Sequence, residues 1–154
     1  WFAGTLFVIT ADHGPRIYGN ATIPVESYRV PVVFLAQGLE PRTHSSLGSI
    51  MDIPTTILDL LDVEDTEGFI GGALFSATHG SALVEHDYHI GMVTQDDLHK
   101  TLTLVPPSSV AESWMLRDSM VDKRTGTDSD DAASLIGIFQ SAHATFYSEE
   151  AANK

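Results

Sequence analysis

The chain of 154 residues is 43% hydrophobic and carries 21 acidic against 8 basic side chains, a formal net charge of −13. This length and apolar content suffice for one domain with its own core, whereas the negative charge disfavours nucleic acid as a partner and contact of this segment with an anionic membrane. The absence of cysteine excludes disulfides, thiolate metal sites and cysteine nucleophiles, and no apolar run approaches the roughly 20 residues that span a bilayer.

The chain opens on an apolar run that includes Thr5 to Thr10 and leads into Asp12-His13-Gly14. A short run rich in β-branched and aromatic residues predicts a strand buried on both faces of an α/β sheet. Asp12 and His13 then fall at its carboxyl end, where open α/β sheets place ligands. A carboxylate beside an imidazole offers two ligands to a divalent metal. Gly14 allows a close backbone approach, a positive φ or a simple turn.

Nothing resembling a lead-in precedes this first strand. The chain begins at Trp1, without a methionine or a signal peptide. We therefore expect it to be a piece of a longer polypeptide.

The second predicted strand covers residues 30–36 and follows a polar loop, 14–27. Like the first, it is typical of a buried strand, and we expect the two to be parallel. A helix is then predicted from Pro54 to Leu61, because apolar residues recur there at helical spacing and proline is tolerated in a first turn. Asp52 or Ile53 is the expected cap.

The second half of the chain differs in character after the glycine-rich stretch 68–72. Short, partly alternating runs joined by polar turns predict a small antiparallel sheet; they cover residues 89–94, 98–105 and 113–117. A closing helix is predicted to begin near Ser129 to Asp131, with Leu135, Phe139, Ala142 and Phe146 on one face. We treat residues 1–154 as a single unit, with an α/β part over 1–75 and the sheet and terminal helix over 85–154.

Three histidines, His79, His86 and His89, lie close along the chain together with Glu85 and Asp87, a composition that suggests zinc. A strand from Tyr88 onward would place residues three apart on opposite faces. This placement argues against a shared ion.

Three motifs together resemble a known family. In chain order they are TLFVITADHG, YRVPVVFLAQG and GSIMDIPTTILDLLDV, within residues 1–63. They are similar to the C-terminal part of the catalytic domain in the sulfatase-type alkaline phosphatase superfamily, and most similar to its lipoteichoic acid synthase-like and phosphoglycerol transferase-like branch. A looser likeness extends over residues 85–147. The resemblance implies an α/β fold: the C-terminal part of an alkaline-phosphatase-like sandwich, with buried parallel strands and helices before the antiparallel sheet and last helix.

The resemblance also implies an activity. Members of this superfamily cleave or transfer phosphate or sulfate esters with a metal-activated Thr, Ser or formylglycine nucleophile. Asp12 and His13 match the metal ligands, so we expect one divalent ion, Mn, Mg, Ca or Zn. In the family, the nucleophile and the other acidic ligand lie far upstream, so this chain holds no catalytic nucleophile and should be inactive alone.

Other residues near the predicted site have weaker roles. Two-metal relatives carry a further histidine just before the second strand, but this chain has none there, which favours the single-metal type. Glu26 could take that place, although a solvated loop carboxylate paired with Arg29 is the more ordinary role. Arg16 is a candidate for binding the substrate oxyanion. His44 is a weaker candidate, because an exposed loop histidine is common.

Two other functions stay open. One is a fragment of a formylglycine-dependent sulfatase; the other is a non-catalytic acidic module that binds a cationic partner. By resemblance, the substrate is a phosphate or sulfate ester, including lipid- or glycan-linked esters, and the partner is the N-terminal part of the same protein. The same resemblance implies a membrane-anchored parent whose catalytic domain lies outside the cytoplasm, in the periplasm or at the cell surface.

Overall fold

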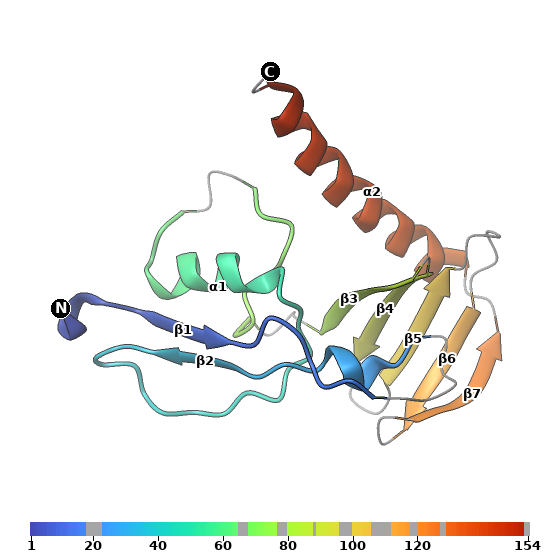
Figure 1. Ribbon diagram of the computed structural model, residues 1–154, viewed down its shortest axis with the longest axis horizontal. Coiled ribbons are helices and arrows are strands. Elements are labelled where there is room, and N and C mark those ends of the chain that lie inside the picture. The colour runs from blue at the N-terminus through green and yellow to red at the C-terminus, as the bar shows by residue number, and fades with distance from the viewer. Residues whose placement is uncertain are drawn as a thin grey trace. The chain divides into compact units, whose positions relative to one another are not determined.

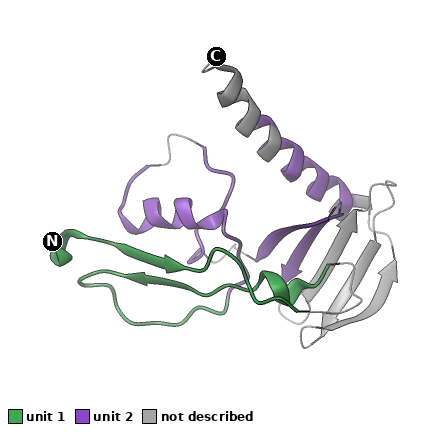
Figure 2. Cartoon of the chain, viewed as in Figure 1, with its two compact units in different colours: residues 1–45 green, residues 46–154 purple. Residues whose placement is uncertain are grey.

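The computed structural model describes residues 1–17, 23–64, 68–76, 80–87, 89–95, 100–105, 112–117, 120–126 and 129–152. For those between 100 and 129, and for 131, 142, 143 and 145–152, it describes the backbone alone. The chain divides into two compact units, Trp1–Ser45 and Ser46–Lys154 (Figure 2). The expectation of a single unit, with an α/β part over residues 1–75 and a sheet and terminal helix over 85–154, stays a prediction.

The first unit is built on two short strands (Figure 1). The 3-10 helix η1 (Phe2–Gly4) precedes β1 (Phe7–Thr10), and η2 (Val25–Tyr28) precedes β2 (Val32–Leu35). Both predicted strands are therefore present.

The pairing of these strands is antiparallel, so the prediction of parallel strands is wrong. Phe7 lies opposite Leu35 and Thr10 opposite Val32. Parallel neighbours need a crossover, usually through an α-helix. The described part of the connection contains only the 3-10 helix η2. Apolar content predicted the strands but carries no information on their relative direction.

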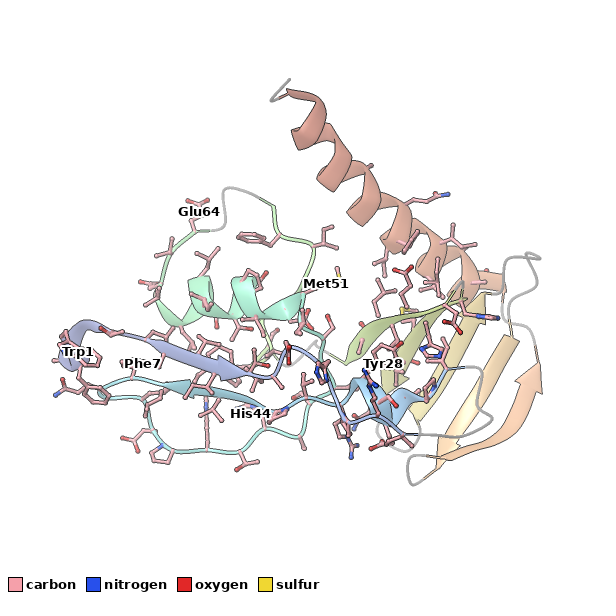
Figure 3. All side chains as sticks on the ribbon, in the orientation of Figure 1. Trp1, Phe7, Tyr28, His44, Met51 and Glu64 are labelled. Carbon is pink, nitrogen blue, oxygen red and sulfur yellow. The ribbon has the colours of Figure 1, made fainter. Side chains whose placement is uncertain are left out.

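The sheet of the first unit is not buried on both faces, contrary to expectation. Ile9 and Val33 are directly opposite each other and are 57% and 52% exposed; Leu35, on the same face, is 45% exposed. These three apolar side chains are therefore open to solvent among the described residues. At one end of this face, the ring of Phe7 packs against Trp1 (Figure 3). The ring centroids of Phe7 lie 5.7 Å from Trp1 and 5.8 Å from Phe2.

Helix α1 (Asp52–Leu60) opens the second unit and confirms the predicted helix, with Pro54 in its first turn. Its N-cap is Met51, so the expectation of a cap at Asp52 or Ile53 is displaced by one or two residues. The Met51 side chain makes no capping hydrogen bond. Asp52 is instead the first helical residue, and its side chain is used elsewhere.

The second unit continues as a five-stranded antiparallel sheet in sequence order. Its strands are β3 (Ser81–His86), β4 (His89–Gln95), β5 (Lys100–Val105), β6 (Glu112–Arg117) and β7 (Met120–Gly126). The predicted antiparallel sheet is confirmed, and β3 and β7 extend it at its two edges. Sequence analysis missed β7 because its residues are mostly polar.

The closing helix α2 (Ser129–Ala152) begins where the sequence predicts and contacts β4 and β5. Its first turns provide the buried Ala132 and Leu135, while Val84 and Val93 are buried in the sheet. Ala142 and Phe146 belong to the predicted apolar face, but their side chains lie outside the described part. None of the helices in the described residues combines the length and the apolar character that crossing a membrane requires.

Candidate metal site after the first strand

Asp12 and His13 follow β1 directly and are both accessible to solvent. Their side chains are 92% and 77% exposed, and His13 Nε2 lies 3.8 Å from Asp12 Oδ1. This separation is longer than a hydrogen bond, so the two groups attract each other electrostatically. Both ligand atoms can therefore be reached by an ion from solution.

The other ring nitrogen of His13 is occupied. Nδ1 donates a hydrogen bond to the carbonyl oxygen of Gly14, at 2.9 Å. This bond, and after it the charge of Asp12, raises the pKa of His13 above its usual value of 6.5, while desolvation acts weakly in the opposite direction. Nδ1 thus holds the proton of the neutral ring and Nε2 is left to ligate, an arrangement common for metal-binding histidines.

Gly14 is required by a close backbone approach, which decides among the three roles that its sequence context allowed. A Cβ at this position would collide with the backbone carbonyl of Ser27 and come within 3.0 Å of the Arg29 carbonyl oxygen. Ser27 makes a second contact with this part of the chain, because its Oγ accepts a hydrogen bond from the Ile17 N–H at 3.2 Å. The backbone on both sides of the Asp-His pair is therefore anchored to the loop that leads into β2.

Thr10, at the end of β1, has a structural role. Its hydroxyl donates to the carbonyl of Pro31 at 3.0 Å, next to the start of β2. This supports its assignment as a strand residue rather than a nucleophile. The hydroxyl of Thr5 likewise donates to the carbonyl of Trp1, at 2.7 Å.

The remaining candidates of the first unit take different positions. Arg16 is exposed, shortly after Gly14. Glu26 pairs with Arg29 in η2, with Oε2 and Nη1 3.3 Å apart, as the ordinary role of a loop carboxylate predicts. His44 is exposed in the segment after β2 (Figure 3).

A complete metal site does not form within the described residues. No group of three or more His, Asp or Glu side chains gathers there in a way that could hold an ion. Asp12 and His13 offer two ligand atoms, whereas a divalent ion in a protein site usually takes three or more.

The histidines of the second unit are arranged differently from the prediction. The register pairs His86 of β3 directly with His89 of β4, so their side chains share one face rather than lying on opposite faces. The prediction treated Tyr88 onward as a continuous strand and missed β3, which pairs with β4 in an antiparallel hairpin. The signal available in the sequence was that only two residues separate the runs that form β3 and β4, a spacing typical of a β-hairpin. His79 lies outside the described residues.

Sequence analysis also missed a buried polar cluster at the start of α1. Asp52 is 4% exposed and Thr56 is fully buried. The Asp52 carboxylate accepts the N–H of Ser49 at 2.5 Å and the N–H of Gly72 at 3.0 Å. The Thr56 hydroxyl donates to the Asp52 carbonyl at 2.6 Å and accepts the Leu74 N–H at 2.9 Å.

The same cluster fixes the glycine-rich stretch against the helix. Thr55 donates its hydroxyl to the Gly71 carbonyl at 2.8 Å, and a Cβ on Gly71 would collide with the backbone of Met51. Because the polar atoms of Asp52 and Thr56 bond to backbone groups, we assign them a structural role. The sequence analysis treated the GFIGG stretch only as an interruption of the pattern. Its glycines were the signal that the backbone passes close to another element at this point.

Comparison with known proteins places these features in a family context. Residues 3–63, which contain β1, the Asp12-His13 pair, β2 and α1, match the model of the Sulfatase family. The fold is similar to the crystal structure of a protein in the alkaline phosphatase superfamily from Vibrio parahaemolyticus, with a TM-score of 0.79 and 21% sequence identity. The match covers 95% of this chain and 37% of that chain. The family match covers less than half of the chain, and the structural similarity shows the α/β fold. The chain spans well under half of the matched structure.

Proposed function

We propose that this chain is the C-terminal portion of a metal-dependent enzyme that hydrolyses or transfers phosphate or sulfate esters, most like a phosphoglycerol transferase. The observation that carries the proposal is the exposed Asp12-His13 pair at the end of β1, inside the stretch that matches the Sulfatase family. In this role, Asp12 and His13 hold one divalent ion together with ligands from another part of the protein.

The donor set of the pair fits such an ion. A carboxylate oxygen and a neutral imidazole nitrogen suit Mn²⁺ or Zn²⁺, and the carboxylate alone also suits Mg²⁺ or Ca²⁺. When bound, the ion would supply Lewis-acid stabilisation of negative charge on the ester oxygens. Asp12 contributes a negative charge, and the Gly14 carbonyl holds the proton of His13 on Nδ1 so that Nε2 can ligate.

Arg16 is the proposed contact for the oxyanion of the substrate. Its guanidinium can donate two parallel hydrogen bonds to a phosphate or sulfate group. The side chain is exposed, and the ties that anchor Gly14 and Ile17 lie on both sides of it along the chain. His44 is a secondary candidate for the same substrate, from the exposed segment after β2.

The exposed apolar face of the first unit supports a role as part of a larger domain. Ile9, Val33 and Leu35 form this face, and a two-stranded sheet is at best marginally stable by itself. We propose that the N-terminal part of the same protein covers the face and supplies the nucleophile and the remaining metal ligands. The isolated 154-residue chain is then catalytically silent.

The longer protein is proposed, by resemblance, to be anchored in the cytoplasmic membrane and to act outside the cytoplasm on a lipid- or glycan-linked ester. A second candidate within the superfamily is a formylglycine-dependent sulfatase, which the match to the Sulfatase model favours. The two candidates differ in substrate: a phosphoglycerol transferase acts on phosphate esters and a sulfatase on sulfate esters.

The assay follows from this difference. The isolated chain and a longer protein containing it are each incubated with p-nitrophenyl phosphate or p-nitrophenyl sulfate and Mn²⁺, Mg²⁺, Ca²⁺ or Zn²⁺. We expect turnover of the phosphate ester by the longer protein only, and its loss in the Asp12→Ala variant. Turnover of the sulfate ester alone would favour the sulfatase. Metal-dependent turnover by the isolated chain, abolished by Asp12→Ala, would overturn the proposal that the nucleophile lies elsewhere.

A further inference from the structure

A second pair of potential ligands lies in the other unit, at the end of the β3–β4 hairpin. His86 closes β3 and His89 opens β4, and the two residues are directly opposite each other in the antiparallel register. Residues opposed in this way project from the same face, with Cβ atoms about 4.5–5.5 Å apart. Two imidazoles at this spacing can approach one ion together.

Two residues separate these histidines along the chain. Asp87 has a φ of +54°, in the left-handed region. The two-residue connection leaves His86 and His89 as the last pair of the ladder. Their separation is therefore set by backbone hydrogen bonding rather than by loop conformation.

The pair lies beside the buried part of the sheet. By strand alternation, His86 and His89 share their face with Val84 and Val93, which are 6% and 2% exposed. His86 itself is 34% exposed, so the pair lies where the buried face of the sheet meets solvent.

The Nδ1 atom of His89 provides an independent indication of a ligand. It is inaccessible to solvent and has no hydrogen-bond partner among the described residues. Buried polar atoms in native structures are nearly always paired, and an orphaned one calls for an explanation such as an ion. Coordination to a metal would satisfy this nitrogen.

Asp87 supplies negative charge next to the pair. Its Oδ2 lies 3.8 Å from His86 Nε2, and its side chain is 77% exposed. A carboxylate beside one nitrogen of a ligating histidine orients the ring. Asp87 is therefore suited to support His86 from outside the coordination sphere.

We propose that His86 and His89 form a binding site for a borderline divalent transition metal such as Zn²⁺, separate from Asp12 and His13. Nitrogen ligands favour such ions over Mg²⁺ and Ca²⁺. The described residues offer no third ligand. With two protein ligands, binding is weaker than in a closed structural zinc site.

Zn²⁺ titration of the whole 154-residue chain tests this site, followed by NMR of the imidazole nitrogens and by calorimetry. We expect the ring nitrogens of His86 and His89 to shift together. We also expect His86→Gln and His89→Gln each to weaken Zn²⁺ binding by at least about tenfold, which is about 1.4 kcal/mol. The His13→Gln variant is the matched control, because it disrupts the first-strand pair and should retain the binding measured at His86 and His89.

Two results would overturn the proposal: Zn²⁺ shifts in other imidazoles without shifts in His86 and His89, or unchanged affinity in both glutamine variants. The shifts of the wild-type chain provide the answer even if a variant does not fold. The inference does not depend on the proposed enzymatic function. Loss of Zn²⁺ binding at His86 and His89 leaves the Asp12-His13 proposal intact, and the reverse holds as well.

Discussion

Gly14 lies against the backbone of Ser27 so closely that a Cβ at position 14 would collide with the Ser27 carbonyl. This contact joins the residue after the Asp-His pair to the loop that enters β2. The position of His13 is thereby coupled to the packing of the connection between the two strands, because the ring also bonds to the Gly14 carbonyl.

Gly14→Ala should disrupt this contact and destabilise the first unit. Because the obstacle is backbone, relief requires the loop to move, and we expect a loss of about 1–3 kcal/mol in the free energy of unfolding. Urea denaturation measures the loss. Gly4→Ala is the matched control, since a Cβ there meets no atom of the described residues within 4 Å. Equal stability of the two variants would contradict the close approach.

Asp52→Asn should destabilise the second unit by about 1–3 kcal/mol, because the amide nitrogen replaces an oxygen that accepts a backbone N–H in a buried position. Asp59→Asn, on the exposed side of the same helix, should change the unfolding free energy by less than about 0.5 kcal/mol. Thermal or urea unfolding of both variants checks this difference. An unchanged free energy of unfolding in Asp52→Asn would show that the cluster does not hold the glycine-rich stretch.

Alanine in place of two other glycines should have effects of opposite sign. Gly71→Ala places a Cβ against the Met51 backbone and should be destabilising. Gly137→Ala lies inside α2, where the added Cβ meets no atom within 4 Å among the described residues. It should stabilise the chain by about 0.5–1 kcal/mol, since alanine restricts the unfolded chain and favours helix. Unfolding midpoints in urea decide the sign, and destabilisation in both would contradict the assignment of free space at Gly137.

His13 should titrate above 6.5, and Asp12→Asn should lower its pKa only in part, because the Gly14 carbonyl is the larger cause of the shift. NMR titration of the His13 ring measures both values. A raised pKa means that protonation favours the folded state: the contribution is complete below the unfolded value of about 6.5 and disappears as pH rises through the folded value. Metal binding should strengthen over the same rise in pH, since the proton competes with the ion. A wild-type pKa at or below 6.5 would contradict the Gly14 hydrogen bond.

Local sequence patterns predicted the helices and strands of this chain better than they predicted strand direction and burial. The apolar runs predicted β1 and β2, and the spacing of apolar residues with Pro54 predicted α1. Strand direction was predicted wrongly, because parallel and antiparallel buried strands have similar composition. The exposure of Ile9 and Val33 was also not foreseen, since a sequence does not say which covering layers are present.

The site residues differ in the same way: some follow from a local motif, and others depend on contacts between distant segments. Asp12 and His13 follow directly from a motif at the end of a strand, and the structure places them there. The pairing of His86 with His89 and the burial of Asp52 depend on register and on contacts between segments far apart in the chain. Periodicity within one segment carries no information on either.

The proposal that Asp12 and His13 hold a divalent metal ion is tested most directly by elemental analysis. The metal content is measured, after dialysis, in a longer protein that contains both residues. We expect one tightly held divalent ion per catalytic domain in the wild type, and loss of most of it in both Asp12→Asn and His13→Gln. The exposed Asp59→Asn should retain the ion. Full metal content in both ligand variants would show that Asp12 and His13 do not hold the metal.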